Sequence, residues 1–465
     1  MNAPYGWSYH PYQPPLFDTG KPYICRIVPD ETTILLEWLP LSGVKEYTVM
    51  CGRRNQEMNI VGHTRECAYQ ITGLDTDCEY QFQVLGGDCS KSRIRLARTG
   101  SCPGTIVNYL HPDDSCYAFS GSYLCSPSMV RHPDGYLLAS MDLFGSGTPQ
   151  NLTLIFRSDD DGATWHYVSE LFPCFWGKMF IHRGRLYMLG CSTEYGDLLI
   201  GCSLDGGKTF STPTVLFRGS CHCKYPGIHK NPQPVVEYNH RLWNTLEWGS
   251  WAIGTHAPMV MSADVDADLL DANSWKFTPP LPYDSSWEGV AKGPSAGNIE
   301  GTLVIAPDQK LYNVMRYDMH RCEPNYGLAL AYRVDADQPE NTLQYAGALP
   351  YPGNHSKFEI HYDAVSGRYW SICSRILDSA NAGSRNLLSL IFSTDLQKWE
   401  LACDLIDRRN EDPATTGFQY VDFFFEGNDL LFLCRTAVNH PHNYHDSNYQ
   451  TFHRLKDFRQ LLNHI

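Results

Sequence analysis

The sequence predicts an all-β protein, a six-bladed β-propeller preceded by a β-sandwich. Two observations lead to this prediction. Between about residues 22 and 99, short segments alternate apolar and polar residues, which is the period of half-buried strands. From about residue 101 onward, a unit of two apolar strands joined by a turn of Gly, Asn or Asp recurs six times.

Composition narrows the class of protein. The 465 residues carry a formal net charge of −14, which argues against nucleic acid as a partner because phosphate binding needs a basic surface. No apolar run approaches the roughly 20 residues of a transmembrane helix, and the start of the chain lacks the basic and apolar segments of a signal peptide. The 17 Cys scatter through predicted strands, as buried thiols do in a reducing compartment. We therefore expect a cytoplasmic protein that binds neither nucleic acid nor membrane, and its oligomeric state stays open.

Residues 21–100 are predicted to form the sandwich, after an N-terminal extension of residues 1–20. Trp38 is expected to fill the core between two sheets. Four further residues form the string L-x-x-x-x-x-Y-x-F-x-V: Leu74, Tyr80, Phe82 and Val84. This string resembles the fibronectin type III signature, which implies a module that positions or presents a neighbour.

Residues 101–465 are predicted to form the propeller. The six units are "SPSMVRHPDGYLLASMD", "GKMFIHRGRLYMLGCSTEYG", "PQPVVEYNHRLWNTLEW", "EGTLVIAPDQKLYNVMRYD", "KFEIHYDAVSGRYWSICSR" and "YVDFFFEGNDLLFLCRTA". The remainder of each unit supplies two outer strands, so that four strands per unit and six units give six blades. The final "YQTFHRLKDF" is expected to add the closing outer strand.

An acidic turn joins the predicted outer strands. "SDDDGATW" at 158–165 and "SLDGGKTF" at 203–210 share the pattern S-x-D-x-G-x-x-aromatic, and weaker copies begin at Ser262 and Ser393. Asp bonds to nearby amides and Gly with positive φ favour such a tight turn. We expect these Asp residues to be scaffold. The repeated turn resembles the Asp box of sialidase-like β-propellers, a superfamily of glycoside hydrolases, and the resemblance covers residues 101–465.

Propeller geometry indicates where a site would form. The start of the first strand and the end of the second strand of every blade surround one mouth, where loops carry function. Strand starts contribute Ser126, Lys178, Gln233, Glu300, Lys357, Tyr420 and Asp422. Strand ends contribute Asp142, Glu194, Tyr195, Glu247, Trp248, Arg316, Arg375 and Arg435. Three arginines at one register predict a pocket for a carboxylate, which a guanidinium binds through two hydrogen bonds.

The sialidase resemblance implies roles for four of these residues. "IEGTLVIAPDQKLYNVMRYD" resembles the unit that carries the family's Glu and Arg, which places Glu300 as the base toward a Tyr nucleophile and Arg316 beside it. "FQYVDFFF" resembles the nucleophile strand and places Tyr420. The family's general acid falls at Asp142 or in the loop after it. The R-I-P tripeptide that opens the first blade in sialidases is absent, because Cys125 and Ser126 stand there.

Three functions remain open from the sequence. The first is an exo-acting glycoside hydrolase that removes a terminal sugar, acidic or next to a uronate, from an oligosaccharide. The second is a uronate lyase, in which a residue such as His445, in a loop that also carries His440 and His442, removes a proton. The third is a non-catalytic glycan-binding propeller.

The residues predicted to bind substrate are Arg316, Arg375, Arg435, Lys178, Gln233, Glu247, Trp248, Asp422 and His445. No cofactor or metal is expected, because "CHCK" at 221–224 has no second Cys/His pair at zinc-ligand spacing.

Overall fold

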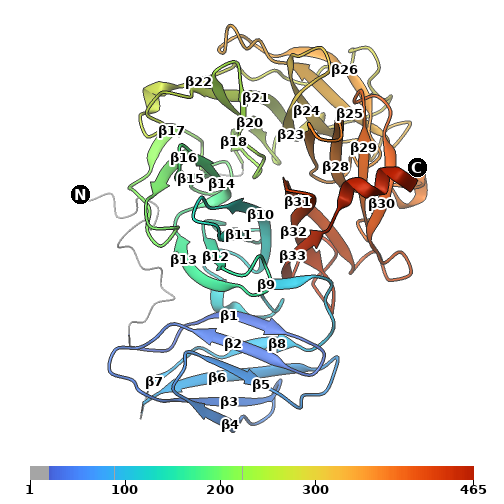
Figure 1. Cartoon of the computed structure of the whole chain (residues 1–465). Coiled ribbons are helices and arrows are strands. Elements are labelled where there is room, and N and C mark those ends of the chain that lie inside the picture. The colour runs from blue at the N-terminus through green and yellow to red at the C-terminus, as the bar shows by residue number, and fades with distance from the viewer. Residues whose placement is uncertain (1–19, 88–89, 222–223, 465) are drawn as a thin grey trace.

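The computed structural model of the chain describes residues 20–87, 90–221 and 224–464. The predicted extension, except Gly20, and two residues of the "CHCK" stretch lie outside these ranges. The described residues form a propeller of six blades and, below it in the view of Figure 1, a β-sandwich. The predicted fold class is confirmed. Within the described ranges no helix has the length and apolar character needed to cross a membrane.

The sandwich consists of two antiparallel sheets. One sheet orders β1 (Ile24–Pro29), β2 (Ile34–Trp38) and β5 (Ala68–Ile71). The other contains β4 (Asn59–Thr64), β3 (Tyr47–Arg53), β6 (Glu79–Gly86), β7 (Ser90–Lys91) and β8 (Arg95–Arg98). Trp38 is buried between the sheets, with its ring edge-on to Tyr47. The Tyr80 hydroxyl accepts a 2.9 Å hydrogen bond from the Asp75 backbone N–H, the corner contact expected of this fold.

Each blade of the propeller is a sheet whose first strand lies innermost. Blade 1 contains β10 (Tyr123–Arg131), β11 (Leu137–Phe144), β12 (Thr153–Ser158) and β13 (His166–Leu171). Blade 2 contains β14 (Phe175–His182), β15 (Arg185–Cys191), β16 (Leu198–Ser203) and β17 (Thr214–Phe217). Blade 3 contains β18 (Gly227–His229), β19 (Val236–Tyr238), β20 (Arg241–Ser250), β21 (Thr255–Asp264) and β22 (Trp275–Phe277). Blade 4 contains β23 (Asn298–Ile305), β24 (Leu311–Tyr317), β25 (Leu328–Arg333) and β26 (Gln344–Pro350). Blade 5 contains β27 (Glu359–Asp363), β28 (Arg368–Ser374), β29 (Leu387–Ser393) and β30 (Glu400–Asp407).

Blade 6 is built from both ends of the propeller sequence. It contains β31 (Gly417–Glu426), β32 (Asp429–Ala437), β33 (Tyr449–Leu455) and, outermost, β9 (Thr105–Tyr109). The sequence predicts that the C-terminal stretch "YQTFHRLKDF" forms the closing outer strand of this blade. That prediction is wrong by one strand position. β33 is the third strand, and β9 pairs with it as the fourth. The ring closes because its first strand joins its last blade.

Short 3-10 helices complete the described structure. They are η1 (Ser115–Tyr117), η2 (Ala272–Ser274), η3 (Ser379–Asn381) and η4 (Phe458–His464). The C-terminal η4 packs Phe458 against Phe425 and Trp370, and so covers the outside of blades 5 and 6.

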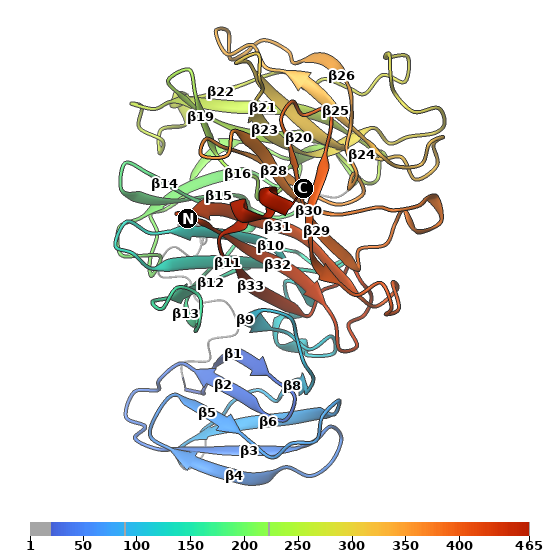
Figure 2. The same ribbon diagram turned by 45° about the vertical axis from the view of Figure 1, so that its right-hand side comes forward.

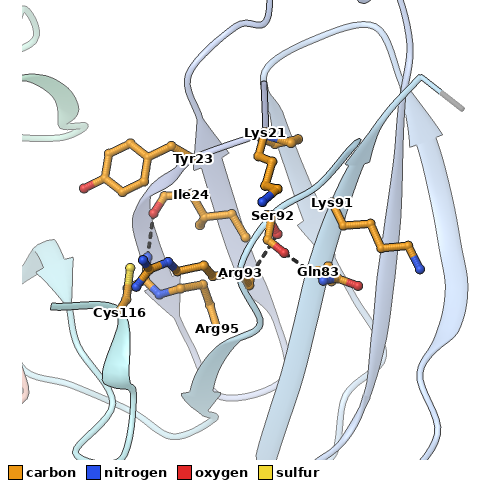
Figure 3. A pocket seen from close by; sticks show the side chains of 10 residues that line it. Lys21, Tyr23, Ile24, Gln83, Lys91, Ser92, Arg93, Arg95 and Cys116 are labelled. Carbon is orange, nitrogen blue, oxygen red and sulfur yellow. Dashed lines mark hydrogen bonds between the residues drawn. The ribbon is translucent and has the colours of Figure 1, made fainter. Parts of the chain in front are cut away.

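The sandwich docks on the propeller through buried polar contacts. Arg95 pairs with Asp114 at 2.5 Å, and the Tyr23 and Tyr117 hydroxyls lie 2.8 Å apart. A cavity of about 370 Å³ opens at this junction, with the Arg95 guanidinium donating to the Ile24 carbonyl at its edge (Figure 3). No residue of the predicted site lines the cavity, and we treat this junction as a docking contact.

The acidic turns lie between the third and fourth strands of their blades. The first joins β12 to β13, the second joins β16 to β17, and the copy at Ser393 joins β29 to β30. In the first turn, Asp160 accepts hydrogen bonds from the Thr164 backbone N–H and the Ser158 hydroxyl, both at 2.8 Å. Third strands begin at the mouth and end at the opposite face, so these turns lie at the far end of the blades from the predicted site.

Replacing Asp160 with Ala is expected to lower the free energy of unfolding by about 0.5–2 kcal/mol, as loss of a capping bond does. The reason is that backbone and hydroxyl donors of the turn lose their acceptor. Thermal and denaturant unfolding of the variant measures the effect, and kcat and KM should stay at the wild-type values. A loss of turnover at unchanged stability would contradict the scaffold role.

Candidate functional site

Four innermost strands contain the same irregularity. The pairing register shifts at a bulge near the start of β10, β14, β23 and β31. One residue in each bulge has a positive φ: Ser126 (51°), Trp176 (53°), Glu300 (57°) and Tyr420 (54°). Such a φ is uncommon for residues other than Gly, and bulges re-aim side chains next to functional sites. The bulge thus selects one residue per blade at the mouth of the propeller.

Two of these bulge residues meet across the axis. The Tyr420 hydroxyl donates a 2.6 Å hydrogen bond to Glu300 Oε1. Arg316, at the end of β24, donates from Nη1 to Glu300 Oε2 at 2.7 Å and to the Tyr420 hydroxyl at 3.1 Å. Glu300 is buried, whereas Tyr420 and Arg316 are partly exposed. A phenol, a carboxylate and a guanidinium therefore share one hydrogen-bonded cluster that solvent can reach.

The electrostatics keep the proton on the phenol. Burial alone would raise the pKa of Glu300, but Arg316, His229 and the Tyr420 hydroxyl together hold that pKa below its usual range. Burial and the Glu300 charge raise the pKa of Tyr420, against three arginines that lower it. In the resting protein Glu300 is a carboxylate that accepts from a neutral phenol, which is the state a base needs before it removes that proton.

Two further guanidinium groups lie over the Tyr420 ring. The Arg435 guanidinium carbon is 4.9 Å from the ring centroid, and that of Arg385 is 5.9 Å from it. Arg435 donates from Nε to the Ser447 hydroxyl at 3.0 Å, and Arg385 donates from Nη2 to the His355 carbonyl at 3.0 Å. With Arg316 these residues make a cluster of three arginines, which we call the arginine pocket.

The arginine pocket has more positive charge than its own carboxylate balances. Glu300 pairs with Arg316 at 2.7 Å. Within the described ranges, neither Arg385 nor Arg435 has a carboxylate within 4.0 Å, although both side chains are buried. Arg385 Nε also lacks a hydrogen-bond partner there. Because a buried unpaired charge is destabilising, this arrangement is suited to an anionic ligand.

Arg375 does not join the pocket, and its predicted place there is wrong. It follows β28 and faces the outer strands, where Nη2 contacts Asp404 at 2.9 Å and Nε donates to the Ser389 hydroxyl at 3.1 Å. Arg385, just before the third strand of the same blade, lies over Tyr420 instead. Third strands also begin at the mouth, a position that the strand-start and strand-end rule left out.

Lys178 and Asp422 do not line the pocket as predicted. They pair with each other at 2.5 Å and are buried. A second buried pair, Lys357 and Glu359, lies at 2.5 Å, and Lys357 also donates to the Val421 carbonyl. Lys178 and Asp422 each come two positions after a bulge residue, Trp176 and Tyr420. They therefore link two innermost strands along the propeller axis, farther inside the propeller than its mouth.

Asp142 lies at a different place from the Glu300–Tyr420 pair. Its carboxylate accepts from the Thr153 hydroxyl at 2.5 Å and from the Trp176 backbone N–H at 2.6 Å. Burial raises its pKa to about 7 against these hydrogen bonds. The side chain is 1% exposed, so it joins blade 1 to the bulge of blade 2. Its predicted role as general acid has no geometric support.

The predicted residues of blade 3 have supporting positions. Gln233 follows the unexpected strand β18 and donates to the Phe358 carbonyl at 2.9 Å. Glu247 holds His229 Nδ1 at 2.7 Å and accepts from the Gly301 backbone N–H at 3.3 Å, next to Glu300. Trp248 is partly exposed and packs edge-on to Phe217, 5.8 Å between centroids, against the core. The binding of substrate by Gln233 and Trp248 stays a prediction.

A group of aromatic side chains borders the Glu300 side of the mouth. His229 packs on His256, 4.9 Å between centroids, and the Tyr195 hydroxyl lies 3.1 Å from His256 Nε2. Burial, with His229 and Arg316 nearby, lowers the pKa of His256 to about 2, so that ring is neutral. Trp251 packs edge-on to His256 at 4.7 Å and is 55% exposed. An exposed indole at a polar mouth is suited to stacking on a sugar face.

Glu194 is a second carboxyl group of this region and is more exposed than Glu300. It is partly buried and accepts a 2.8 Å hydrogen bond from Gln150 Nε2. Burial raises its pKa, against the effects of Gln150, His229 and Trp251. The charge of His229 lowers the pKa of both Glu194 and Glu300, and the pKa values of these two carboxyl groups move in opposite directions. Such a pair suggests an acid and a base.

His445 is the one histidine of its loop that reaches the arginine pocket. Its Nδ1 lies 3.2 Å from Arg435 Nη2 and 2.9 Å from Asp446 Oδ1. Burial and Arg435 lower its pKa to about 4. His440 and His442 instead approach Asp77 of the sandwich and Asp113, at 3.7 and 3.9 Å. The loop therefore spans from the pocket to the sandwich.

Solved structures resemble the fold of this chain at low sequence identity. An α-L-arabinanase from Penicillium chrysogenum, complexed with arabinobiose, aligns with a TM-score of 0.50 and 12% identity over 78% of this chain and 99% of that chain. The NanB sialidase from Streptococcus pneumoniae aligns with a TM-score of 0.47 and 10% identity over 92% and 84%. The FN5 domain of Drosophila Lar aligns with a TM-score of 0.17 and 22% identity over 18% and 98%. No protein-family model matches the chain, and no curated protein sequence matches it. The arabinanase likeness concerns the fold alone: the two chains share a propeller architecture.

Proposed function

We propose that the protein is an exo-acting glycoside hydrolase that removes a terminal acidic sugar from an oligosaccharide. The observation that carries the proposal is the 2.6 Å hydrogen bond from Tyr420 to Glu300 beneath three arginines. Arg385 and Arg435 would bind the sugar carboxylate, since each offers a planar pair of donors. A neutral arabinoside, related to the ligand in the similar arabinanase structure, is then the contrasting substrate.

The reaction would proceed through a covalent intermediate on Tyr420. As the phenol oxygen forms a bond to the anomeric carbon, its proton passes to Glu300, the bond to the leaving oxygen breaks, and that oxygen takes a proton from Glu194. The guanidinium groups stabilise the phenolate character that develops on Tyr420 during this step. Water then attacks the anomeric carbon and gives a proton to the Glu194 carboxylate, while the bond to Tyr420 breaks and Glu300 returns its proton to the phenol oxygen.

A panel of aryl glycosides tests the proposal. It contains a sialoside, a glucuronide and an arabinofuranoside, each with the same fluorescent phenol as leaving group. We expect release from an acidic sugar and none from the arabinofuranoside. A fluorinated analogue of the cleaved sugar should form a covalent adduct with the protein. Mass spectrometry should locate the added mass on the peptide that contains Tyr420, and the Tyr420→Phe variant should not be labelled. Release from the neutral sugar alone would contradict the proposal.

Glu194 is our proposed general acid, and replacing it with Gln tests this through the leaving group. An aryl oxide leaves without much protonation, so kcat on the aryl glycoside should change little. An alkyl glycoside of the same sugar should be cleaved about 10²-fold more slowly, within the usual share of a positioned acid. Because the acid acts while protonated, wild-type activity should fall as pH rises through the raised pKa of Glu194. Equal losses on both leaving groups would count against this role.

A uronate lyase has one specific observation in its favour. His445 is held beside Arg435 at 3.2 Å, and its low pKa keeps it neutral, as a base must be. Such an enzyme would form an unsaturated uronate that absorbs ultraviolet light. Product analysis on a uronate disaccharide therefore separates the two reactions, because hydrolysis leaves both sugars saturated. Loss of elimination in His445→Gln with an intact Tyr420 would favour the lyase.

A further inference from the structure

A group of metal-ligand side chains lies beside the arginine pocket, and none of these side chains has a role in the site described above. Asp318 and His320 follow β24, and His355 lies in the segment between β26 and β27. One ligand atom of each residue lies within 4.8 Å of those of the other two. His355 is buried, Asp318 is partly buried and His320 is exposed, so the group opens to solvent on the His320 side.

The two imidazole rings lie against each other, with centroids 3.8 Å apart and planes tilted by 37°. His355 Nδ1 lies 3.0 Å from His320 Nε2. His355 Nε2 lies 2.7 Å from the Asn325 carbonyl oxygen. A carbonyl only accepts, so His355 Nε2 carries the proton and its Nδ1 keeps a lone pair on the side of His320. Metal-binding histidines are oriented in this way, with the second ring N–H given to a backbone carbonyl.

The separations suit a divalent ion. Zinc binds imidazole nitrogen at about 2.0–2.1 Å and carboxylate oxygen at about 2.0–2.2 Å. Two nitrogens on one tetrahedral ion are then about 3.4 Å apart by that geometry, a few tenths of an ångström more than observed. Asp318 has acceptor capacity left among the residues that the structure describes, where its oxygens accept only from the Ala296 and His320 backbone N–H groups, both at 3.3 Å.

The supporting shell is also in place. Asn354, next to His355, donates from Nδ2 to the Tyr317 carbonyl at 3.0 Å, so it ties the two loops together. The His355 carbonyl accepts from Arg385 Nη2 at 3.0 Å. An ion at this point would therefore fix the loop that holds an arginine of the pocket.

A second group with the same residue types lacks these features. His240, Asp264 and Asp266 also lie within 4.8 Å of one another. His240 and Asp266 are exposed and Asp264 is half-exposed, and Asp266 already pairs with Arg183. His240 Nε2 bonds directly to Asp266 at 2.9 Å. We interpret this group as a surface ion pair, and it supplies a matched control for metal binding.

We propose that Asp318, His320 and His355 form a site for one divalent transition-metal ion, with Zn²⁺ as the fitting ion, at the edge of the arginine pocket. Two histidines and one carboxylate suit such ions and leave a coordination position for water or a sugar hydroxyl. The ion would tie the loop after β24 to the loop before β27. This inference is independent of the hydrolase proposal, because it concerns binding of the metal alone.

The experiment measures metal binding by the full chain after treatment with a chelator and dialysis. Calorimetric titration with Zn²⁺, and Co²⁺ absorption in the visible range, should both give one equivalent. His320→Ala should weaken Zn²⁺ binding about 100-fold or more, since loss of a ligand exceeds the 10–100-fold effect of outer-shell changes. Asp318→Asn should weaken it in the same direction, and His240→Ala should bind as wild type does.

Thermal unfolding gives a second readout. Zn²⁺ should raise the Tm of wild type and of His240→Ala, because it binds the folded state, and should raise the Tm of His320→Ala much less. His320 is exposed, so this variant should fold. The proposal is overturned if wild type shows no saturable equivalent, or if His320→Ala and Asp318→Asn bind as wild type does. Binding that is lost in Cys221→Ser and kept in His320→Ala would place the ion elsewhere and overturn it equally.

Discussion

Replacing Glu300 with Gln is expected to lower kcat by about 10²–10⁴-fold, the usual share of a positioned acid or base. Gln keeps the shape of the side chain but cannot take the proton of Tyr420, which now donates to Glu300 Oε1 at 2.6 Å. Because this proton moves whatever the leaving group is, the loss should appear on aryl and alkyl glycosides alike. Initial rates on the cleaved acidic glycoside measure the effect.

Two controls accompany this measurement. Glu194→Gln should retain most activity on the aryl glycoside, which separates a missing base from a missing acid. The pH profile of wild type should show activity lost as pH falls through the Glu300 pKa, which Arg316 and its neighbours hold low. The acid limb should therefore lie below that of an ordinary glutamate. A folded Glu300→Gln protein with near wild-type kcat would exclude Glu300 as the base.

Replacing Arg385 with Ala is expected to weaken binding of an acidic sugar by about 1.5–3 kcal/mol, the value of a hydrogen bond to a charged group. This corresponds to about 10–150-fold in Kd or KM. Arg385 is buried and has no carboxylate partner within 4.0 Å in the described ranges. The ligand carboxylate would be its counter-ion. Inhibition by the free acidic sugar, measured on wild type and variant, gives the ratio.

Arg375→Ala is the matched control within the same blade. Arg375 faces Asp404 at 2.9 Å, away from the pocket, so its loss should leave Kd and kcat unchanged. A neutral sugar alcohol should inhibit wild type and Arg385→Ala equally. If Arg375→Ala loses affinity for the acidic sugar while Arg385→Ala keeps it, the assignment of the pocket is wrong.

The fold could be predicted from the sequence because its main signals are local. A strand, a turn and a second strand occupy about twenty residues, and the side chains that face the core recur at period two. The outer strand of blade 6 could not be predicted in this way. The local sequence of β9 does not indicate which blade it joins. Its pairing with β33 depends on closure of the ring, which no local pattern encodes.

The candidate site could be predicted only where strand register determined it. Ile299 pairs with Arg316 and Gln419 with Arg435, so the bulge residues Glu300 and Tyr420 fall beside arginines at strand ends. Arg385 lies in a loop before β29, and its position depends on hydrogen bonds to the His355 carbonyl and the Gln419 side chain. Both partners are distant in sequence. A rule that also counted the starts of third strands would have found it.

The pairing of β9 with β33 has a consequence for the order of events during synthesis. Tyr109 pairs with Tyr449, so about 340 residues intervene between the two partners. At a translation rate of roughly 5–20 residues per second, β9 waits about 20–70 s for its neighbour. During that interval five blades can form, while an unpaired edge remains open on either side of the gap, and such edges invite pairing with other chains. The nascent chain is therefore most vulnerable to aggregation after the fifth blade has formed and before β33 emerges, and chaperones that bind unpaired strands should act on it then.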